Sequence, residues 1–147
     1  GSAPRSAQLG RGFRHGFDMT FDCPTVPRAE QPCFLILARD IADADRAARL
    51  RDEHLAGHLA HVERNWRRYL TAGPIRKPGE TRLTGSTFLV FADSEAEARA
   101  LMEADPYFTC GLYETVEVFD QTLAVGRYLG GKIWESAEAV RARASAS

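Results

Sequence analysis

The fold of this chain is indicated most clearly by the segment Ser86-Thr87-Phe88-Leu89-Val90-Phe91-Ala92-Asp93-Ser94-Glu95-Ala96-Glu97. It begins with aromatic and β-branched side chains, a composition that is typical of a buried strand. Ser94 and Glu97 then have the spacing of a helix capping box. A helix is expected over residues 95–104, and Asp105-Pro106 ends it because the residue before a proline avoids helical geometry. The stretch therefore predicts a strand followed directly by a helix.

A similar strand and helix precede this stretch. Cys33-Phe34-Leu35-Ile36-Leu37-Ala38 is a short apolar run after Pro32 and predicts a buried strand. One long helix is expected over residues 41–66, with Asp43 or Asp45 as its N-cap. The apolar residues that recur at helical spacing, and that are expected to be buried, are Leu55, Leu59, Val62 and Trp66.

The remaining strands complete the order strand, helix, strand, strand, helix, strand. A short strand is expected over residues 69–72, ended by Gly73-Pro74, with a polar loop over residues 75–84. Residues 113–119 alternate between polar and apolar side chains, which predicts a last strand with one solvated face. This order is typical of an α+β, ferredoxin-like βαββαβ domain, in which two helices cover one face of an antiparallel sheet. Homodimerisation is the simplest way to cover the other face.

The two ends of the chain are expected to lie outside this domain. Residues 1–31 contain several glycines and prolines and little periodic apolarity, so they are expected to be a flexible leader. The ferredoxin-like domain is expected to span residues 32–120. Residues 121–147 are expected to form a C-terminal arm with a short alanine-rich helix, packed on its own domain or on a partner.

Composition argues against several classes of protein. The formal net charge is −1, so no overall field favours nucleic acid or an anionic membrane. No apolar run reaches the length of a membrane span. Three cysteines, Cys23, Cys33 and Cys110, lack paired metal-ligand spacing, which favours reduced thiols in a cytoplasmic protein. The expected partners are a small-molecule substrate and a second copy of the chain.

His58 and Asp105 are the most informative pair of polar residues. His58 lies in the later half of the first expected helix, and Asp105 lies at the end of the second. Because each helix follows a strand of similar direction, the two residues are expected at the same level of the domain. A carboxylate would fix the imidazole tautomer and leave the other ring nitrogen free to move a substrate proton. The alternatives are a structural histidine and an aspartate that only forms a turn.

Other polar residues give weaker predictions. His54 and His61 share the helical face of His58, and two histidines four residues apart can bind one metal ion. No cysteine pair and no intervening carboxylate completes such a site, so no metal and no cofactor are expected. Cys110 follows Asp105 in the same turn and is either a nucleophile with His58 as its base or a small buried thiol.

Several short segments occur in a fixed order along the chain. They are His58-Leu59-Ala60-His61-Val62, Ala72-Gly73-Pro74, Gly85-Ser86, Glu97-Ala98-Arg99, Ala104-Asp105-Pro106-Tyr107 and Gly111-Leu112-Tyr113-Glu114. Together they resemble the YCII-related (YciI-like) domain family, and the resemblance runs from about Cys33 to Phe119. It implies a ferredoxin-like dimeric α/β barrel that is related in fold to muconolactone isomerase.

The resemblance also implies an active site. The histidine and aspartate of the family match His58 and Asp105, and Ser86 matches a serine that often accompanies them. Some members of the family eliminate chloride from chlorinated muconolactones. An arginine that often stands three residues before the histidine is Leu55 here, and Arg51 is expected to replace it. This departure leaves the substrate open.

The resulting hypothesis is a small homodimeric lyase or isomerase that moves a proton next to a carbonyl of a small carboxylate or lactone. His58 and Asp105 are the expected catalytic residues. The expected substrate-binding residues are Ser86, Tyr107, Arg51, Gly73 and Pro74. The main alternative is a non-catalytic small-molecule-binding or accessory module on the same dimeric fold. A haem-binding oxygenase of related fold is the third hypothesis.

Overall fold

The structure is a computed structural model that describes residues 22–146. Two compact units divide this part of the chain: a larger one over residues 29–122, and a smaller one that combines residues 22–28 with residues 123–146. Most of the expected leader, residues 1–21, lies outside the described residues. No helix in the described part combines the length and apolarity that a membrane crossing requires.

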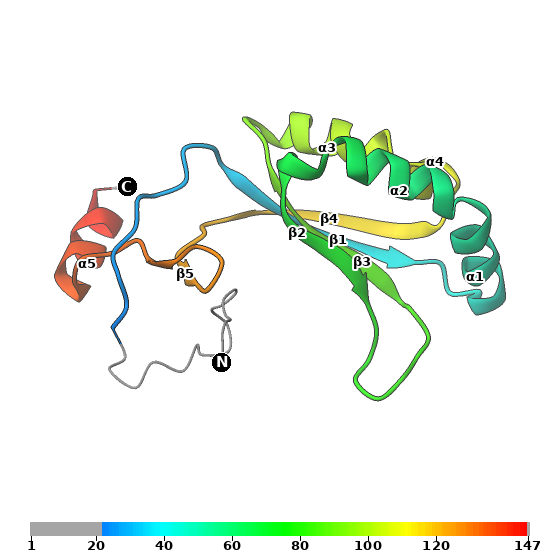
Figure 1. Cartoon of the computed structure of the whole chain (residues 1–147), viewed down its shortest axis with the longest axis horizontal. Coiled ribbons are helices and arrows are strands. Elements are labelled where there is room, and N and C mark those ends of the chain that lie inside the picture. Colours follow the sequence, from blue (N-terminus) through cyan, green and yellow to red (C-terminus); the bar gives the residue numbers. More distant parts are fainter. Residues whose placement is uncertain (1–21, 147) are drawn as a thin grey trace, which may run out of the picture. The chain divides into compact units, whose positions relative to one another are not determined.

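The larger unit is built on a four-stranded antiparallel sheet. Its strands are β1 (Cys33–Asp40), β2 (Tyr69–Ile75), β3 (Gly85–Phe91) and β4 (Tyr113–Gln121). Their order across the sheet is β2-β3-β1-β4. In this register Ile36 on β1 lies opposite Phe88 on β3 and opposite Val118 on β4. Figure 1 shows the helices of the unit along one face of this sheet, which confirms the predicted α+β, ferredoxin-like fold.

The helices of the larger unit are α1 (Ala44–Glu53), α2 (Leu55–Arg64), the short helix η2 (Trp66–Arg68), α3 (Glu95–Glu103) and α4 (Pro106–Thr109). Asp43 caps α1, because its carboxylate accepts a hydrogen bond from the Arg46 amide at 3.1 Å. Ser94 caps α3 in the same way through the Glu97 amide, as predicted. The prediction of one long first helix is wrong, because the backbone of His54 leaves helical geometry between α1 and α2.

The hydrophobic core fills the space between the sheet and α3. The sheet contributes Phe34, Ile36, Ala38, Phe88 and Val90, and α3 contributes Ala98, Leu101 and Met102. From Phe34 to Ala38 on β1, and from Ser86 to Val90 on β3, buried residues alternate with less buried ones. This alternation is expected when helices of the same unit cover only one face of the sheet.

The opposite face of the sheet also carries apolar residues. Leu35 lies opposite Leu89 on β3 and opposite Phe119 on β4. Leu35 and Leu89 alternate along their strands with core residues, and Phe119 follows Val118, which packs against the core, so all three point to the other face. Phe119 is 47% exposed. Within the larger unit, the helices lie on the core side of the sheet and leave this face open (Figure 1).

The prediction that the first helical segment buries its apolar stripe is wrong for most of the stripe. Leu55 and Leu59 are each 45% exposed and Trp66 is 61% exposed, whereas His61 is the buried residue of α2. Because the apolar residues of α3 fill the core against the sheet, Leu55 and Leu59 of α2 remain partly exposed. Helical spacing shows which residues share a face, but it does not show what that face contacts.

The edge strand β2 continues further than the sequence predicted. Gly73 and Pro74 lie inside the strand rather than ending it, and Pro74 lies opposite Ser86 on β3. A proline is tolerated here because only one side of an edge strand needs amide donors. The longer strand brings Gly73 and Pro74 close to Ser86.

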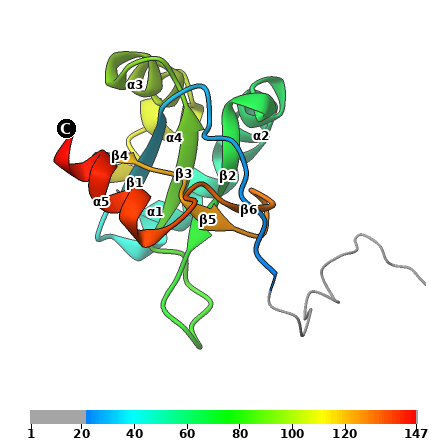
Figure 2. The same ribbon diagram turned by 90° about the vertical axis from the view of Figure 1, so that its left-hand side faces the viewer.

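The smaller unit joins the two ends of the described chain. β5 (Val125–Gly126) pairs with β6 (Gly131–Lys132), and Figure 2 shows this short pair beside the N-terminal segment of the unit. Thr25 forms a parallel bridge with Lys132, whose Nζ donates a hydrogen bond to the Cys23 carbonyl at 2.7 Å. The helix α5 (Ala137–Ser145) follows and has no buried residue. Part of the expected leader thus pairs with the expected arm.

Gly85 on β3 allows a test of the close packing between β1 and β3. A Cβ atom at this position would collide with the carbonyl group of Ala38, which is part of the backbone. Gly85→Ala is therefore expected to lower the free energy of unfolding by roughly 1–3 kcal/mol in urea denaturation. Gly73→Ala is the matched control, because nothing lies within 4 Å of its added Cβ. Equal unfolding midpoints for the two variants would contradict the packing described.

Candidate active site

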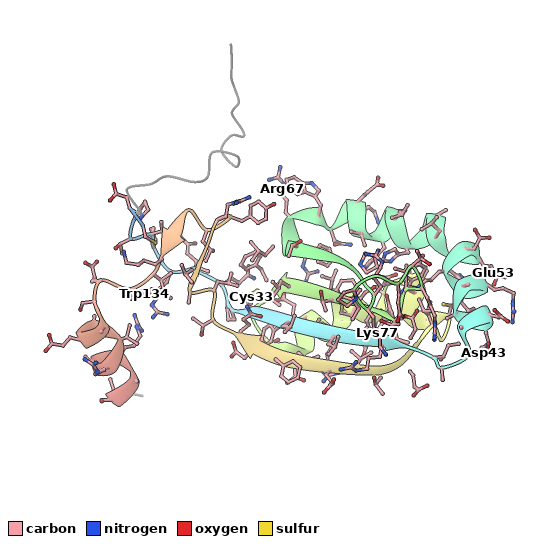
Figure 3. The ribbon with its side chains drawn as sticks, turned by 90° about the horizontal axis from the view of Figure 1, so that it is seen from below. Cys33, Asp43, Glu53, Arg67, Lys77 and Trp134 are labelled. Atoms are coloured by element: carbon pink, nitrogen blue, oxygen red, sulfur yellow. The ribbon has the colours of Figure 1, made fainter. Side chains whose placement is uncertain are left out.

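A pocket of about 500 Å³ opens between α2 and the β2 edge of the sheet. Its lining consists of Arg51, Asp52, Leu55, His58, Leu59, Val62, Ala72, Gly73, Pro74, Leu83, Ser86, Phe88 and Tyr107. The half-exposed apolar residues of α2 form one wall, and β2 and β3 form others. The loop between β2 and β3 contributes Leu83, whereas Lys77 of the same loop (Figure 3) is not part of the lining. An apolar pocket with few polar groups is typical of a small-molecule site.

His58 and Asp105 are in direct contact at this pocket. Both carboxylate oxygens of Asp105 lie 2.9 Å from His58 Nδ1. Asp105 is 0% exposed, and its Oδ1 also accepts a hydrogen bond from the Tyr107 amide at 2.9 Å. An ionised carboxylate only accepts hydrogen bonds, so Nδ1 carries the proton and Nε2 of the neutral ring has the free lone pair. This arrangement fixes the tautomer of the ring and leaves Nε2 as the nitrogen that Asp105 does not contact.

Local structure brings these two residues together. Asp105 is the N-cap of α4, and Pro106 occupies the first helical position, where its missing amide proton costs no hydrogen bond. Gly57 precedes His58 on α2, and a Cβ atom there would lie only 3.1 Å from Pro106 Cγ. The missing side chain therefore lets α2 approach α4 closely. A glycine inside a helical pattern is the signal in the sequence that could have indicated this close approach.

Tyr107 contacts both the His58 ring and the backbone of Arg51. The two rings stack with their centroids 3.9 Å apart and their planes at 5°. The Tyr107 hydroxyl donates a hydrogen bond to the Arg51 carbonyl at 2.9 Å. Burial raises the pKa of Tyr107, and the nearby charge of Arg51 opposes this rise. The hydroxyl therefore remains protonated and continues to donate at neutral pH.

Arg51 lines the pocket, but Asp40 binds its guanidinium group. Arg51 Nε and Nη2 lie 3.0 Å and 2.9 Å from the two carboxylate oxygens of Asp40, and Nη2 also donates to the Gly85 carbonyl at 3.2 Å. Burial alone would lower the pKa of Arg51, but the hydrogen bond and charge of Asp40 raise it overall. Asp40 was not predicted as part of the site, because a carboxylate at the end of a strand does not reveal its partner.

Ser86 receives a hydrogen bond from a half-buried tyrosine. The Tyr113 hydroxyl donates to Ser86 Oγ at 3.2 Å. Burial raises the pKa of Tyr113 far above its ordinary value, so this hydroxyl stays protonated. Because Ser86 Oγ accepts this hydrogen bond, its own proton can be donated to a ligand in the pocket. Tyr113 was part of the motif comparison but was not predicted to support the site.

The residues that the sequence singled out for the site lie around one pocket. Those that line it directly are His58, Ser86, Tyr107, Arg51, Gly73 and Pro74. Asp105 is not part of the lining and reaches the pocket through its hydrogen bond to His58. The apolar wall formed by α2 was missed, because its residues were expected in the core.

His54, His61 and Cys110 do not join this group of side chains. His54 Nε2 lies 3.9 Å from Glu53. His61 is buried beside a separate groove of about 320 Å³, and its Nε2 has no hydrogen-bond partner. Cys110 Sγ contacts the Tyr107 carbonyl oxygen at 3.5 Å and does not line the pocket. Among residues 22–146, no group of three or more His, Cys, Asp or Glu side chains is arranged to hold a metal ion.

Known proteins are similar in sequence to part of this chain. Residues 33–122 match the YCII-related domain. Protein YciI from Escherichia coli and Protein YciI from Shigella flexneri are each 39% identical to this chain over 92 residues. The aligned region covers 58% of this chain and 91% of either relative. The residues that match the domain, 33–122, fall within the larger unit, which contains the pocket.

A solved structure supports the same relationship. It is the 5-chloro-2-hydroxyhydroquinone dehydrochlorinase (TftG) from Burkholderia phenoliruptrix in complex with 2,5-dihydroxybenzoquinone. The match has a TM-score of 0.55 and 26% sequence identity, and it covers 64% of this chain and 95% of that chain. Together with the domain match over residues 33–122, these findings confirm the predicted relationship: the chain belongs to the YCII-related domain family.

Proposed function

We propose that this protein is a small acid/base enzyme, a lyase or an isomerase, that moves a proton next to a carbonyl group of a small carboxylate or lactone. The observation that carries the proposal is the hydrogen bond from His58 Nδ1 to the buried Asp105 carboxylate, beside a mostly apolar pocket. A histidine that a carboxylate holds in one tautomer is a common general base, because its second nitrogen is available near neutral pH.

His58 acts through Nε2 in this proposal. The neutral ring takes the proton from the carbon next to the carbonyl, and the Asp105 carboxylate stabilises the imidazolium that forms. In an elimination, the electron pair of the broken C–H bond forms a double bond, and the leaving group departs with its own electron pair. In an isomerisation, the imidazolium returns the proton to a different carbon atom. Both routes use the same two residues.

The pocket supports a small ring-shaped substrate. A volume of about 500 Å³ with apolar walls suits a compact organic molecule. Ser86 donates a hydrogen bond to the substrate carbonyl, where negative charge develops as the proton leaves. Gly73 and Pro74 form the wall next to Ser86, and a Cβ atom added at Gly73 would meet nothing within 4 Å. Tyr107 and Arg51 complete the polar side of the pocket.

The similarity to a dehydrochlorinase favours the elimination route. The related solved structure is named for that reaction and contains a dihydroxybenzoquinone. This chain covers 95% of that protein at 26% identity, so the likeness extends over the whole of the related domain. We infer an elimination in which a small ring loses a proton to His58 and a leaving group such as chloride.

We also propose that the protein acts as a homodimer. The outer sheet face with Leu35, Leu89 and Phe119 has no helix of the larger unit over it. An apolar face of this kind is unfavourable in water. A second copy can cover it with the same residues, because a two-fold interface is self-complementary.

Replacement of His58 tests the catalytic role. His58→Ala is expected to lower kcat by roughly 10²–10⁴-fold, because the ring supplies general acid/base catalysis. Turnover is measured by absorbance and chloride release on small lactones, unsaturated acids and 5-chloro-2-hydroxyhydroquinone. His54→Ala is the matched control and should keep wild-type turnover, since His54 lies next to the same helix and outside the pocket.

Two outcomes of this experiment would contradict the proposed function or the proposed role of His58. Unchanged turnover in His58→Ala would remove His58 from the chemistry. Binding of the tested compounds by the wild-type protein without any turnover would instead favour the non-catalytic binding module.

Replacement of Asp105 tests the tautomer directly. In Asp105→Asn the side-chain oxygen can still accept from the Tyr107 amide, but the new NH₂ group donates to His58 Nδ1. The imidazole proton is then expected at Nε2, where it blocks the base, as in the analogous triad. NMR chemical shifts of the imidazole nitrogens measure this change without a substrate. Asp43→Asn is the matched control, because Asp43 also caps a helix with its carboxylate and should leave the His58 spectrum unaltered.

The homodimer is tested on the outer sheet face. Phe119→Glu is expected to convert a dimer to a monomer in sedimentation velocity, because it places a charge in the proposed interface. Trp66→Glu is the matched control, since Trp66 is an exposed aromatic residue on η2 instead of the sheet. If the wild-type protein sediments as a monomer, or if Phe119→Glu remains a dimer, the proposed interface is wrong.

A further inference from the structure

We propose that Asp40, Arg51 and Tyr107 form a positioning network that fixes the plane of the His58 imidazole. The inference rests on the proposed function, because it assigns a purpose to that orientation. Tyr107 touches both members of the pair: its ring stacks on His58 at 3.9 Å, and its amide donates to Asp105 at 2.9 Å. Asp40 acts only through its neighbours and is a positioning residue.

The hydrogen bond to Asp105 alone leaves the His58 ring free to tilt. Nδ1 lies 2.9 Å from both carboxylate oxygens, so the bond is shared and does not select one ring plane. The second side-chain torsion of a histidine is also intrinsically broad. A stacked ring at an interplanar angle of 5° removes this freedom, because a tilt of the imidazole would break the contact. The direction of the Nε2 lone pair therefore depends on Tyr107.

Tyr107 is held at its far end. Its hydroxyl donates to the Arg51 carbonyl at 2.9 Å, near the end of α1, while its backbone lies in α4. The aromatic ring thus spans from α4 to α1 and passes against His58 on α2. Loss of this hydrogen bond would leave the Tyr107 ring stacked on His58 but no longer fixed to the Arg51 carbonyl.

The side chain of Arg51 anchors the same point to the sheet. Its Nε and Nη2 form a two-point ion pair with the Asp40 carboxylate, and Nη2 also donates to the Gly85 carbonyl. The Asp40 side chain is only 2% exposed, so this pair is poorly screened by solvent. Asp40 lies at the end of β1 and Gly85 at the start of β3. The network therefore connects the central strands to the imidazole.

The ion pair with Asp40 also occupies the edge of the Arg51 guanidinium that could otherwise bind a substrate carboxylate. Recognition of a substrate carboxylate at two points uses two neighbouring N–H groups of an arginine. Here Nε and Nη2, which form such an edge, are already engaged by Asp40. Arg51 contributes charge to the pocket wall, but its Nε–Nη2 edge binds Asp40 instead of a substrate.

Two variants test the network at different points. Tyr107→Phe removes only the hydroxyl, and Asp40→Asn removes the charge that holds Arg51. Both are expected to increase the mobility of the His58 ring in NMR relaxation measurements, and to lower kcat roughly tenfold to a hundredfold with KM unchanged. Tyr69→Phe is the matched control, because the buried Tyr69 hydroxyl has no hydrogen-bond partner. It should leave both the ring mobility and kcat at wild-type values.

The NMR readout separates this inference from the proposed function. Unchanged His58 mobility in Tyr107→Phe would overturn the network, even if turnover fell. If Asp40→Asn does not fold, Tyr107→Phe alone decides, since it keeps the ring and the ion pair. If the variants show increased His58 mobility while the wild-type protein shows no turnover, the network is supported and the proposed enzymatic function is contradicted.

Discussion

The hydrogen bond between His58 Nδ1 and the Asp105 carboxylate is the interaction on which the rest of the site depends. A carboxylate that is completely buried is unfavourable unless it is paired, and its partners here are His58 and the Tyr107 amide. The contact requires α2 to lie close to α4, and Gly57 makes this approach possible. The position of α2 is therefore determined by a polar pair as well as by apolar packing.

The pocket follows from this position of α2. Because α3 supplies the core against the sheet, Leu55 and Leu59 on α2 stay half exposed and form a wall of the cavity. Apolar surface that remains in contact with water gives a ligand a favourable place to bind. The same fold thus separates the residues that stabilise it from the residues that a ligand can cover.

The family relationship concerns the larger unit and not the whole chain. The domain match ends at residue 122, which is also where the larger unit ends. Beyond it, the smaller unit has contacts of its own, such as the bridge between Thr25 and Lys132. The added segments therefore form a second folded unit, in which part of the expected leader pairs with the expected arm.

The sequence alone indicated the order of the four strands of the larger unit, the cap at Ser94, and the placement of His58 and Asp105 at one level of the domain. These features follow from local patterns, because periodicity, capping and proline positions act within a few residues. The exposed face of α2 and the binding of Arg51 by Asp40 could be seen only in the folded protein. Burial and ion pairing depend on which distant segments pack together, and local residue patterns do not specify that packing.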